Sequence, residues 1–230
     1  MPALAERPSG RWADLATRTL SALVLAPVAV ACVWLGGVAF DGIVAAAMAG
    51  LAVEWWMLCR RRNSATLVAA GLAYVALAGA SLVWLRGDAP GGRADVIFLL
   101  CIVWAGDIGA YLVGRLVGGP RLAPRISPGK TWSGAAGGLL AAVVAGALVS
   151  HLLSGTALWY AAPVAAILGI VAQGGDLLES YVKRRLEVKD SGHLIPGHGG
   201  LFDRLDGLLA AAPAAALLAL TLGSGVVLWQ

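Results

Sequence analysis

The sequence predicts an all-α, polytopic membrane protein with about seven spans, and three observations lead to this fold class. Hydrophobic residues make up 59% of the 230 residues, the mean hydropathy is +0.80, and only 13% of the residues are charged. A soluble domain is nearer ~45–50% apolar, so the bilayer must be the main solvent of this chain. Charged blocks are short and always separate apolar runs, so we expect one integral membrane domain over residues 1–230.

Apolar windows set the expected spans, because a membrane helix needs roughly 20 consecutive apolar residues. Seven windows meet this length: Thr19–Gly36, Val38–Leu58, Ala65–Leu85, Ala94–Val117, Thr131–Leu153, Ala157–Leu178 and Leu208–Trp229. The first window follows Arg11 and Arg18 and so has the look of a signal peptide. Further spans follow it, and we predict an uncleaved first span.

The distribution of positive charge predicts the orientation. When the spans alternate across the membrane, all of the 17 Lys and Arg residues except Arg86 and Arg93 fall on one side. Cytoplasmic loops carry the excess of Lys and Arg, so this side, with the N-terminus, is expected to be cytoplasmic. The C-terminus is then extracytoplasmic.

Two cytoplasmic segments, residues 114–130 and 183–206, are longer and more polar than connectors need to be. Each follows a span with an acid near its cytoplasmic end, Asp107 or Asp176, and charge at mid-membrane costs about 2.5–3.5 kcal/mol. We therefore expect both acids to face a shared polar cavity, although Asp107 paired with a cation merely to hold helices together remains an alternative. Helical spacing puts two sets of side chains on single faces: Asp107, Tyr111 and Arg115, and Asp176, Glu179, Ser180 and Lys183.

Two further acids, Asp203 and Asp206, stand three residues apart at the start of the last span, on one helix face. With Asp176 they offer three hard oxygen ligands, which suit magnesium bound together with substrate phosphates. Positive charge lies beside them in Lys183, Arg184, Lys189 and Arg204. Acids interleaved with cations are typical of a site for a metal-bound polyphosphate. A solvated positive-inside loop would explain the cations, but not the acids or the glycines of this segment.

Several simpler motifs are rejected. Residues 128–131 resemble the end of a Walker A loop, but Pro124 stands where the upstream glycine is required. His193 and His198 flank Pro196 in a loop with no cysteine nearby, so a zinc pair is not expected. Two interpretations of His198 stay open, a structural role and contact with a phosphate. The three cysteines show no metal or disulfide spacing.

The segment from Ser180 to Asp206 resembles the signature of the phosphatidate cytidylyltransferases, also called CDP-diacylglycerol synthases. The family pattern is Ser-x-apolar-Lys-Arg, four residues, Lys-Asp, then Pro-x-His-Gly-Gly-apolar-x-Asp-Arg-x-Asp, and the sequence matches it throughout. Residues 107–118 and 126–134 resemble the family's other cytoplasmic stretches, although Ser133 stands where the family often has Glu. The resemblance is strong from about Trp104 to the C-terminus and weak in the spans of residues 1–90, and the expected catalytic portion is residues 94–230.

This resemblance implies a reaction of phospholipid biosynthesis in which CTP and phosphatidate give CDP-diacylglycerol and pyrophosphate, with magnesium and, in relatives, potassium. The implied metal ligands are Asp176, Asp203 and Asp206. The expected catalytic set is Asp176, Lys183, Arg184, Lys189, Asp190, His198, Asp203, Arg204 and Asp206. The expected substrate-binding set is Asp107, Tyr111, Arg115, Ser127, Lys130, Thr131, Ser180, Gly199 and Gly200.

The expected partners are the two substrates and membrane lipids, a homodimer stays open, and nucleic acid is not expected. The expected location is a bacterial inner membrane, with the site facing the cytoplasm. Two alternatives remain. A transporter would bind near the midplane at broken helices in two related halves, and we find no such pair. A second enzyme would use CTP with another lipid phosphate, and nothing in the apolar spans distinguishes the two acceptors.

Overall fold

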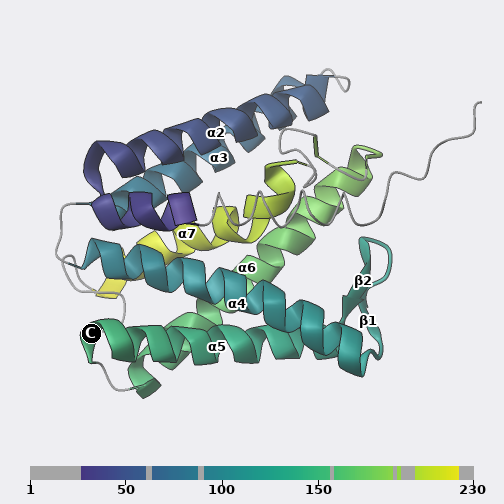
Figure 1. Cartoon of the computed structure of the whole chain (residues 1–230). Helices are drawn as coiled ribbons and strands as arrows, with labels where there is room; N and C mark the ends of the chain where they lie inside the picture. Colours follow the sequence, from purple (N-terminus) through teal and green to yellow (C-terminus); the bar gives the residue numbers. More distant parts are fainter. Residues whose placement is uncertain are drawn as a thin grey trace, which may run out of the picture.

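The computed structural model describes residues 27–60, 64–87, 91–155, 158–188, 191–192 and 200–222. Residues 27–35 are helical, and the elements that follow are labelled in Figure 1. They are α2 (Gly37–Cys59), α3 (Ala65–Arg86), α4 (Gly92–Val117), β1 (Arg121–Ala123), β2 (Ser127–Thr131), α5 (Trp132–Ser154), α6 (Leu158–Arg185) and α7 (Phe202–Leu222).

Six of the seven predicted spans are confirmed as helices long and apolar enough to cross a membrane, namely α2 to α7. The predicted first span, Thr19–Gly36, lies mostly outside the described residues, which contain its helical part from residue 27 to residue 35. The chain is thus an integral membrane protein with six candidate spans in its described part. Its orientation stays a prediction.

Helix α4 lies in the middle of the bundle and packs on α5, α6, α7 and α3 (Figure 1). Phe98, Leu99 and Ile102 of α4 are fully buried in the main core, together with Leu168 of α6. A second cluster joins α2 and α3 to α7 through residues that include Leu51, Trp55, Val75, Phe202 and Leu209. This arrangement brings the last turns of α4 and α6 to the same end of the bundle as the first turns of α5 and α7.

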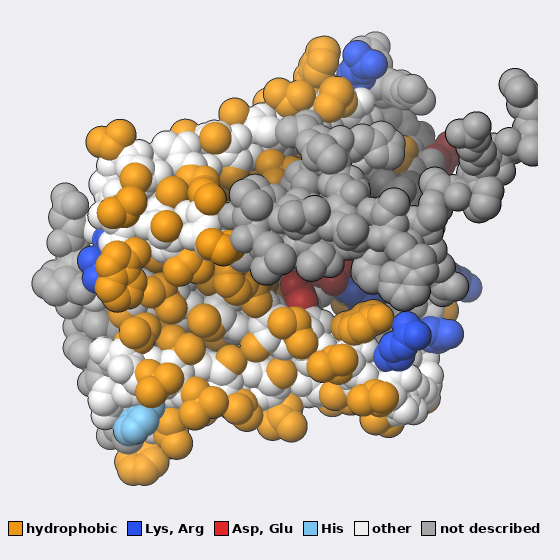
Figure 2. Space-filling model, in the orientation of Figure 1, with side chains coloured by type: hydrophobic (Ala, Val, Ile, Leu, Met, Phe, Trp, Pro, Cys, Tyr) orange, Lys and Arg blue, Asp and Glu red, His pale blue; other side chains and the backbone are white. Residues whose placement is uncertain are grey.

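The outer surface of the bundle is apolar, as a surface in contact with lipid must be. Leu140, Val144, Leu148 and Leu152 of α5 are all exposed, and their four-residue spacing forms one stripe along the helix. Figure 2 shows hydrophobic side chains spread over most of the described face, with Lys and Arg gathered mainly toward one end. Exposure of such an apolar surface to water is unfavourable, whereas contact with the lipid chains of a bilayer is not.

A short antiparallel hairpin, β1 and β2, joins α4 to α5, and the all-helical prediction missed it. Helix α4 ends where Gly118 and Gly119 adopt φ angles of +64° and +106°, which a residue with a Cβ rarely tolerates. The chain then turns back, and Thr131 caps α5 by accepting a hydrogen bond from the backbone N–H of Gly134 at 3.0 Å. The polar segment predicted over residues 114–130 therefore contains a hairpin that lies beside the helix ends.

Two helices extend further into the polar segments than hydropathy predicted. Helix α6 continues past Leu178 to Arg185, and α7 begins at Phe202 instead of Leu208. Hydropathy detects only the apolar part of a helix, whereas its polar end turns can stay helical above the hydrocarbon. The predicted loop of residues 183–206 is therefore shorter, and Lys183, Asp203 and Asp206 stand on helices.

Helices α4 and α5 approach each other closely because glycines line their interface. A Cβ added at Gly109 would lie 2.5 Å from the Cβ of Ala141 and 2.9 Å from the backbone oxygen of Gly137. Small residues of this kind allow helix backbones in membranes to pack closely.

We expect Gly109→Ala to destabilise the protein, since the new methyl group must push α4 and α5 apart. Overpacking of this kind costs about 1–3 kcal/mol, more than the ~0.5–1 kcal/mol that alanine gains over glycine in a helix. Thermal unfolding in detergent should show a lower midpoint for Gly109→Ala than for the wild type. The matched control is Gly174→Ala in α6, where an added Cβ meets nothing within 4 Å; equal midpoints for the two variants would contradict this account.

Candidate active site

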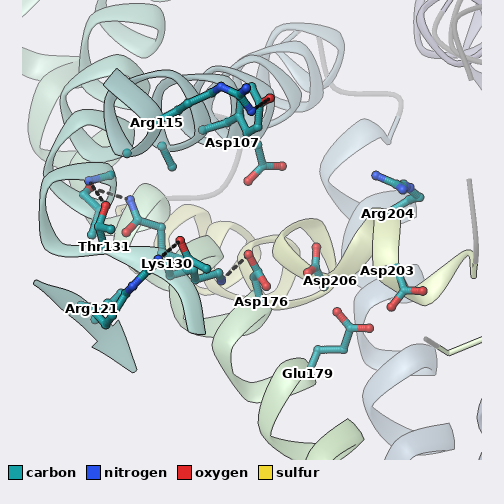
Figure 3. Close-up of a pocket in the computed structure, with 18 of the residues that line it drawn as sticks. Asp107, Arg115, Arg121, Lys130, Thr131, Asp176, Glu179, Asp203, Arg204 and Asp206 are labelled. Carbon is teal, nitrogen blue, oxygen red and sulfur yellow. Dashed lines mark hydrogen bonds and ion pairs between the residues drawn. The ribbon is translucent and has the colours of Figure 1, made fainter. Parts of the chain in front are cut away.

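A cavity of about 620 Å³ opens at the end of the bundle where α4 and α6 finish and α5 and α7 begin (Figure 3). It is built from α4, the hairpin, the first turn of α5, α6 and α7. Its ionisable lining residues are Asp107, Tyr111, Arg115, Arg121, Lys130, Asp176, Glu179, Lys183, Asp203, Arg204 and Asp206. The predicted shared cavity between Asp107 and Asp176 is therefore confirmed.

Three carboxylates meet inside this cavity. Asp176 and Glu179 of α6 and Asp206 of α7 each offer a carboxylate oxygen within 4.8 Å of the other two. Figure 3 shows the side chains of Glu179 and Asp206 directed toward the same space. Both oxygens of Glu179 are buried and accept no hydrogen bond from the described residues, although one of them forms an ion pair. Three acids so close together repel each other unless a cation lies among them, and hard oxygen ligands suit a divalent ion.

Lys183 compensates part of this negative charge. Its Nζ lies 2.5 Å from Oδ1 of Asp203 and 3.1 Å from Oε1 of Glu179, one helical turn before it on α6. Oδ2 of Asp203 also accepts hydrogen bonds from the backbone N–H groups of Ser191 and Gly200, at 3.2 and 3.1 Å. Asp203 thus lies in the cavity, but its carboxylate faces Lys183 and the backbone, and it does not belong to the group of three.

The hairpin supplies cations from the opposite side of the cavity. Lys130, at the end of β2, forms an ion pair with Asp176 (Figure 3). Arg121 of β1 donates a hydrogen bond to the backbone oxygen of Gly129 at 3.4 Å. The hairpin therefore brings positive charge above the acids of α6.

Helix α4 forms the remaining wall. Nη1 of Arg115 donates to the hydroxyl of Tyr111 at 3.2 Å, and Asp107 lies two turns deeper on the same face. Tyr111 is 63% exposed, so this wall borders the outside of the molecule as well as the cavity. In Figure 2 acidic side chains are visible close to hydrophobic side chains of the described face. Through Tyr111 the cavity wall adjoins the apolar outer surface.

Most of the predicted site residues meet here. The predicted residues that line the cavity are Asp107, Tyr111, Arg115, Lys130, Thr131, Asp176, Lys183, Asp203, Arg204 and Asp206. Four others are described but do not line it, namely Ser127, Ser180, Arg184 and Gly200. Arg184 instead donates from Nε to the backbone oxygen of Ile126 at 3.2 Å, which ties α6 to the hairpin. Lys189, Asp190, His198 and Gly199 lie outside the described residues, as does His193.

Among the lining residues with polar or charged side chains, three were missed as site residues, namely Glu179, Gln173 and Arg121. Glu179 carried a signal, because its i+3 spacing from Asp176 puts both acids on one face of α6. Gln173 is a polar residue inside an apolar span, and its Nε2 donates to the backbone oxygen of Ala135 at 3.1 Å. Arg121 carried no such signal, since its place depends on the hairpin.

Ser133, at the position where the resemblance expects Glu, has a local structural role. Its hydroxyl hydrogen-bonds to the backbone oxygen of Gly118 and lies 3.0 Å from the Thr131 hydroxyl. Ser133 thereby joins the end of α4 to the start of α5. It does not line the cavity.

Comparison with known proteins is consistent with this geometry. The model of the cytidylyltransferase family matches residues 61–222. A phosphatidate cytidylyltransferase from Brucella suis biovar 1 is 40% identical over an alignment covering 86% of this chain and 91% of the relative. One from Rickettsia bellii is 35% identical over 87% of this chain and 88% of the relative. One from Mycobacterium leprae is 47% identical over 54% of this chain and 40% of the relative.

Proposed function

Because this chain belongs to the cytidylyltransferase family, we propose that it transfers the cytidylyl group of CTP to phosphatidate, giving CDP-diacylglycerol and pyrophosphate. The observation that carries this proposal is the group of Asp176, Glu179 and Asp206, flanked by Lys130 and Lys183 in a cavity at one end of the bundle. A transporter does not need such a group at a helix end, and family membership decides against that alternative.

The residues present fit a divalent metal. The three carboxylates are close enough to share one ion, and the buried carboxylate of Glu179 has one cationic neighbour among the described residues, Nζ of Lys183 at 3.1 Å from Oε1. We propose magnesium at this position, because it prefers carboxylates combined with substrate phosphates. When bound, magnesium neutralises the charge that develops on the triphosphate. The group of three differs from the ligand set that the sequence predicted, since Glu179 stands where Asp203 was expected. Asp203 already accepts hydrogen bonds from Lys183 and from the backbone N–H groups of Ser191 and Gly200, which leaves it less free to bind a metal.

Cytidylyl transfer joins a phosphatidate oxygen to the α-phosphorus of CTP and breaks the bond between that phosphorus and the oxygen that leaves with pyrophosphate. The acceptor phosphate is already an anion at neutral pH, so no general base is needed. Catalysis then consists of positioning two anions and neutralising their charge. We assign these tasks to Lys130, Lys183 and Arg204, while Arg115 and Tyr111 stand where the acceptor phosphate would enter from the apolar surface.

We further propose that the cavity faces the cytoplasm of a bacterial cell, with the chain in the inner membrane. Lys130, Lys183 and Arg115 lie at the cavity end of the bundle, whereas Arg86 and Arg93 lie at the opposite helix ends. This separation agrees with the positive-inside rule.

We expect pyrophosphate release by the purified protein to require CTP, phosphatidate and magnesium together. Exhaustive chelation should lower the rate to background, because the acids would then repel the triphosphate, and added magnesium should restore it. An enzyme-coupled pyrophosphate assay measures the rate after chelation and after magnesium is added back. In the control, sodium chloride of equal ionic strength replaces the magnesium salt. Undiminished turnover after chelation would rule out the metal, and turnover with isoprenoid phosphates but not phosphatidate would change the acceptor.

A further inference from the structure

Glu54 is a buried acid in the N-terminal half of the chain, outside the lining of the cavity. It belongs to α2, is 0% exposed, and does not line the cavity. It also lies before residues 61–222, which the family model matches. An ionised group in a membrane span is costly to bury, so a buried acid of this kind needs a specific partner.

The partner of Glu54 is the chain segment that leads into α7. Its Oε1 accepts a hydrogen bond from the backbone N–H of Leu201 at 2.8 Å, and its Oε2 accepts one from that of Phe202 at 2.9 Å. The hydroxyl of Ser191 donates to Oε2 at 3.3 Å. The first N–H groups of a helix have no partner within the helix, so Glu54 satisfies two donors at the start of α7 from another helix.

Asp203 binds the same segment from the cavity side. Asp203 accepts hydrogen bonds from the backbone N–H groups of Ser191 and Gly200. Glu54 accepts hydrogen bonds from the Ser191 hydroxyl and from the backbone N–H groups of Leu201 and Phe202. Ser191 and the start of α7 are therefore held together by two carboxylates on opposite sides. Only Asp203 also contacts Lys183.

The packing at this junction leaves no free space. A Cβ at Gly200 would lie 1.8 Å from Oγ of Ser191, and a Cβ at Gly192 would lie 2.9 Å from Oε1 of Glu54. Both glycines are therefore required for the backbone to approach the carboxylate. A change at Glu54 must shift the start of α7, because the atoms around the carboxylate are already closely packed.

We propose that Glu54 is a positioning residue for the proposed cytidylyl transfer: it fixes the first turn of α7 so that Asp203 reaches Lys183 and Asp206 reaches Asp176 and Glu179 (Figure 3). Glu54 touches neither substrate nor metal and acts through Leu201 and Phe202. The N-terminal helices thereby set the geometry of a cavity to which they contribute no lining residue.

The test is Glu54→Gln, which keeps the size of the side chain but turns an NH₂ group toward a backbone N–H donor. We expect the magnesium concentration for half-maximal rate to rise about 10-fold to 100-fold, the range for loss of a partner that orients metal ligands. Binding of Mn²⁺ alone, followed by electron paramagnetic resonance, should weaken by a similar factor. Glu54→Asp keeps the charge and should recover part of the affinity. The matched control is Asp41→Asn, which removes an exposed acid of the same helix.

A purely structural role for Glu54 predicts a different result. The fraction of active protein would fall, but the remaining molecules would keep the wild-type metal affinity in both assays, and this outcome would overturn the proposal. If Glu54→Gln does not fold, Ser191→Ala decides, because it removes one of the three hydrogen bonds and should weaken metal binding in the same direction by a smaller factor. If the wild-type protein bound Mn²⁺ but did not use CTP and phosphatidate, the proposed function would be wrong. The difference in Mn²⁺ binding between the wild type and Glu54→Gln would still test the role of Glu54.

Discussion

Asp206→Asn is expected to lower kcat/KM by at least about 100-fold while leaving the protein at least as stable as the wild type. Loss of one group that stabilises developing charge costs ~10²–10³ in rate, and Asp206 would supply this stabilisation through the metal ion that it helps to hold. Asp206 contributes one of the three carboxylates that meet in the cavity, and asparagine removes its charge without changing its size. The carboxylate accepts the backbone N–H of Gly207 at 2.7 Å, and the asparagine oxygen can accept it as well.

The stability expectation follows from charge repulsion. With Asp206 neutral, Asp176 and Glu179 lose an acidic neighbour, so the thermal midpoint without metal should stay equal or rise. Kinetics of pyrophosphate release and thermal unfolding in detergent, measured on the same preparation, test both parts. Asp41→Asn is again the control. Unchanged kcat/KM in Asp206→Asn would remove Asp206 from the site, and a large fall in the midpoint would make its role structural.

The spans could be predicted from the sequence because the bilayer imposes a simple requirement. An apolar run long enough to cross it must be a helix, since lipid satisfies no backbone hydrogen bonds. Helices α2 to α7 meet that requirement. Hydropathy alone did not predict the ends of α6 and α7, because its windows stop at Leu178 and start again at Leu208. Helical spacing did predict that Lys183 and Asp203 stand on helices.

The cavity could be predicted because its acids follow helical spacing. Asp107, Tyr111 and Arg115 share one face of α4, and two turns of α6 bring Asp176 and Lys183 to the same space. The partners of these residues could not be predicted, because they depend on how helices pack. Lys183 of α6 pairs with Asp203 of α7 as well as with Glu179 one turn before it, and the contact across the two helices is not visible in the sequence.

Glu54 shows what a motif-based interpretation leaves out. An acid inside the apolar window Val38–Leu58 is unusual enough to be a signal of function or specific pairing. It was missed because its partners are backbone N–H groups more than a hundred residues away, and no side-chain pattern records them. The hairpin was missed for a related reason, since short strands rich in proline and glycine carry little strand propensity.

Lys183→Met is expected to separate turnover from metal binding. Nζ of Lys183 lies between Asp203 and Glu179, with only 15% of the side chain exposed, and methionine has a similar length without the charge. We expect kcat/KM to fall by about 100-fold, since a cation aimed at the triphosphate is lost. Binding of Mn²⁺ should stay equal or become tighter, because Asp203 and Glu179 lose a competing cation and a divalent ion can take its place.

The two readouts assign the role of Lys183. Electron paramagnetic resonance reports Mn²⁺ binding without substrate, and steady-state kinetics with CTP and phosphatidate report turnover. Lys183→Arg is the matched variant, since it keeps the charge and should retain metal binding near the wild-type level with a smaller loss of rate. If Mn²⁺ binding and turnover fell together in Lys183→Met, the lysine would hold the acids in place and not act on the substrate. Tighter metal binding with lost turnover would instead mean that Lys183 competes with the metal for Asp203. Asp203 would then become a further metal ligand when Lys183 binds the substrate phosphates.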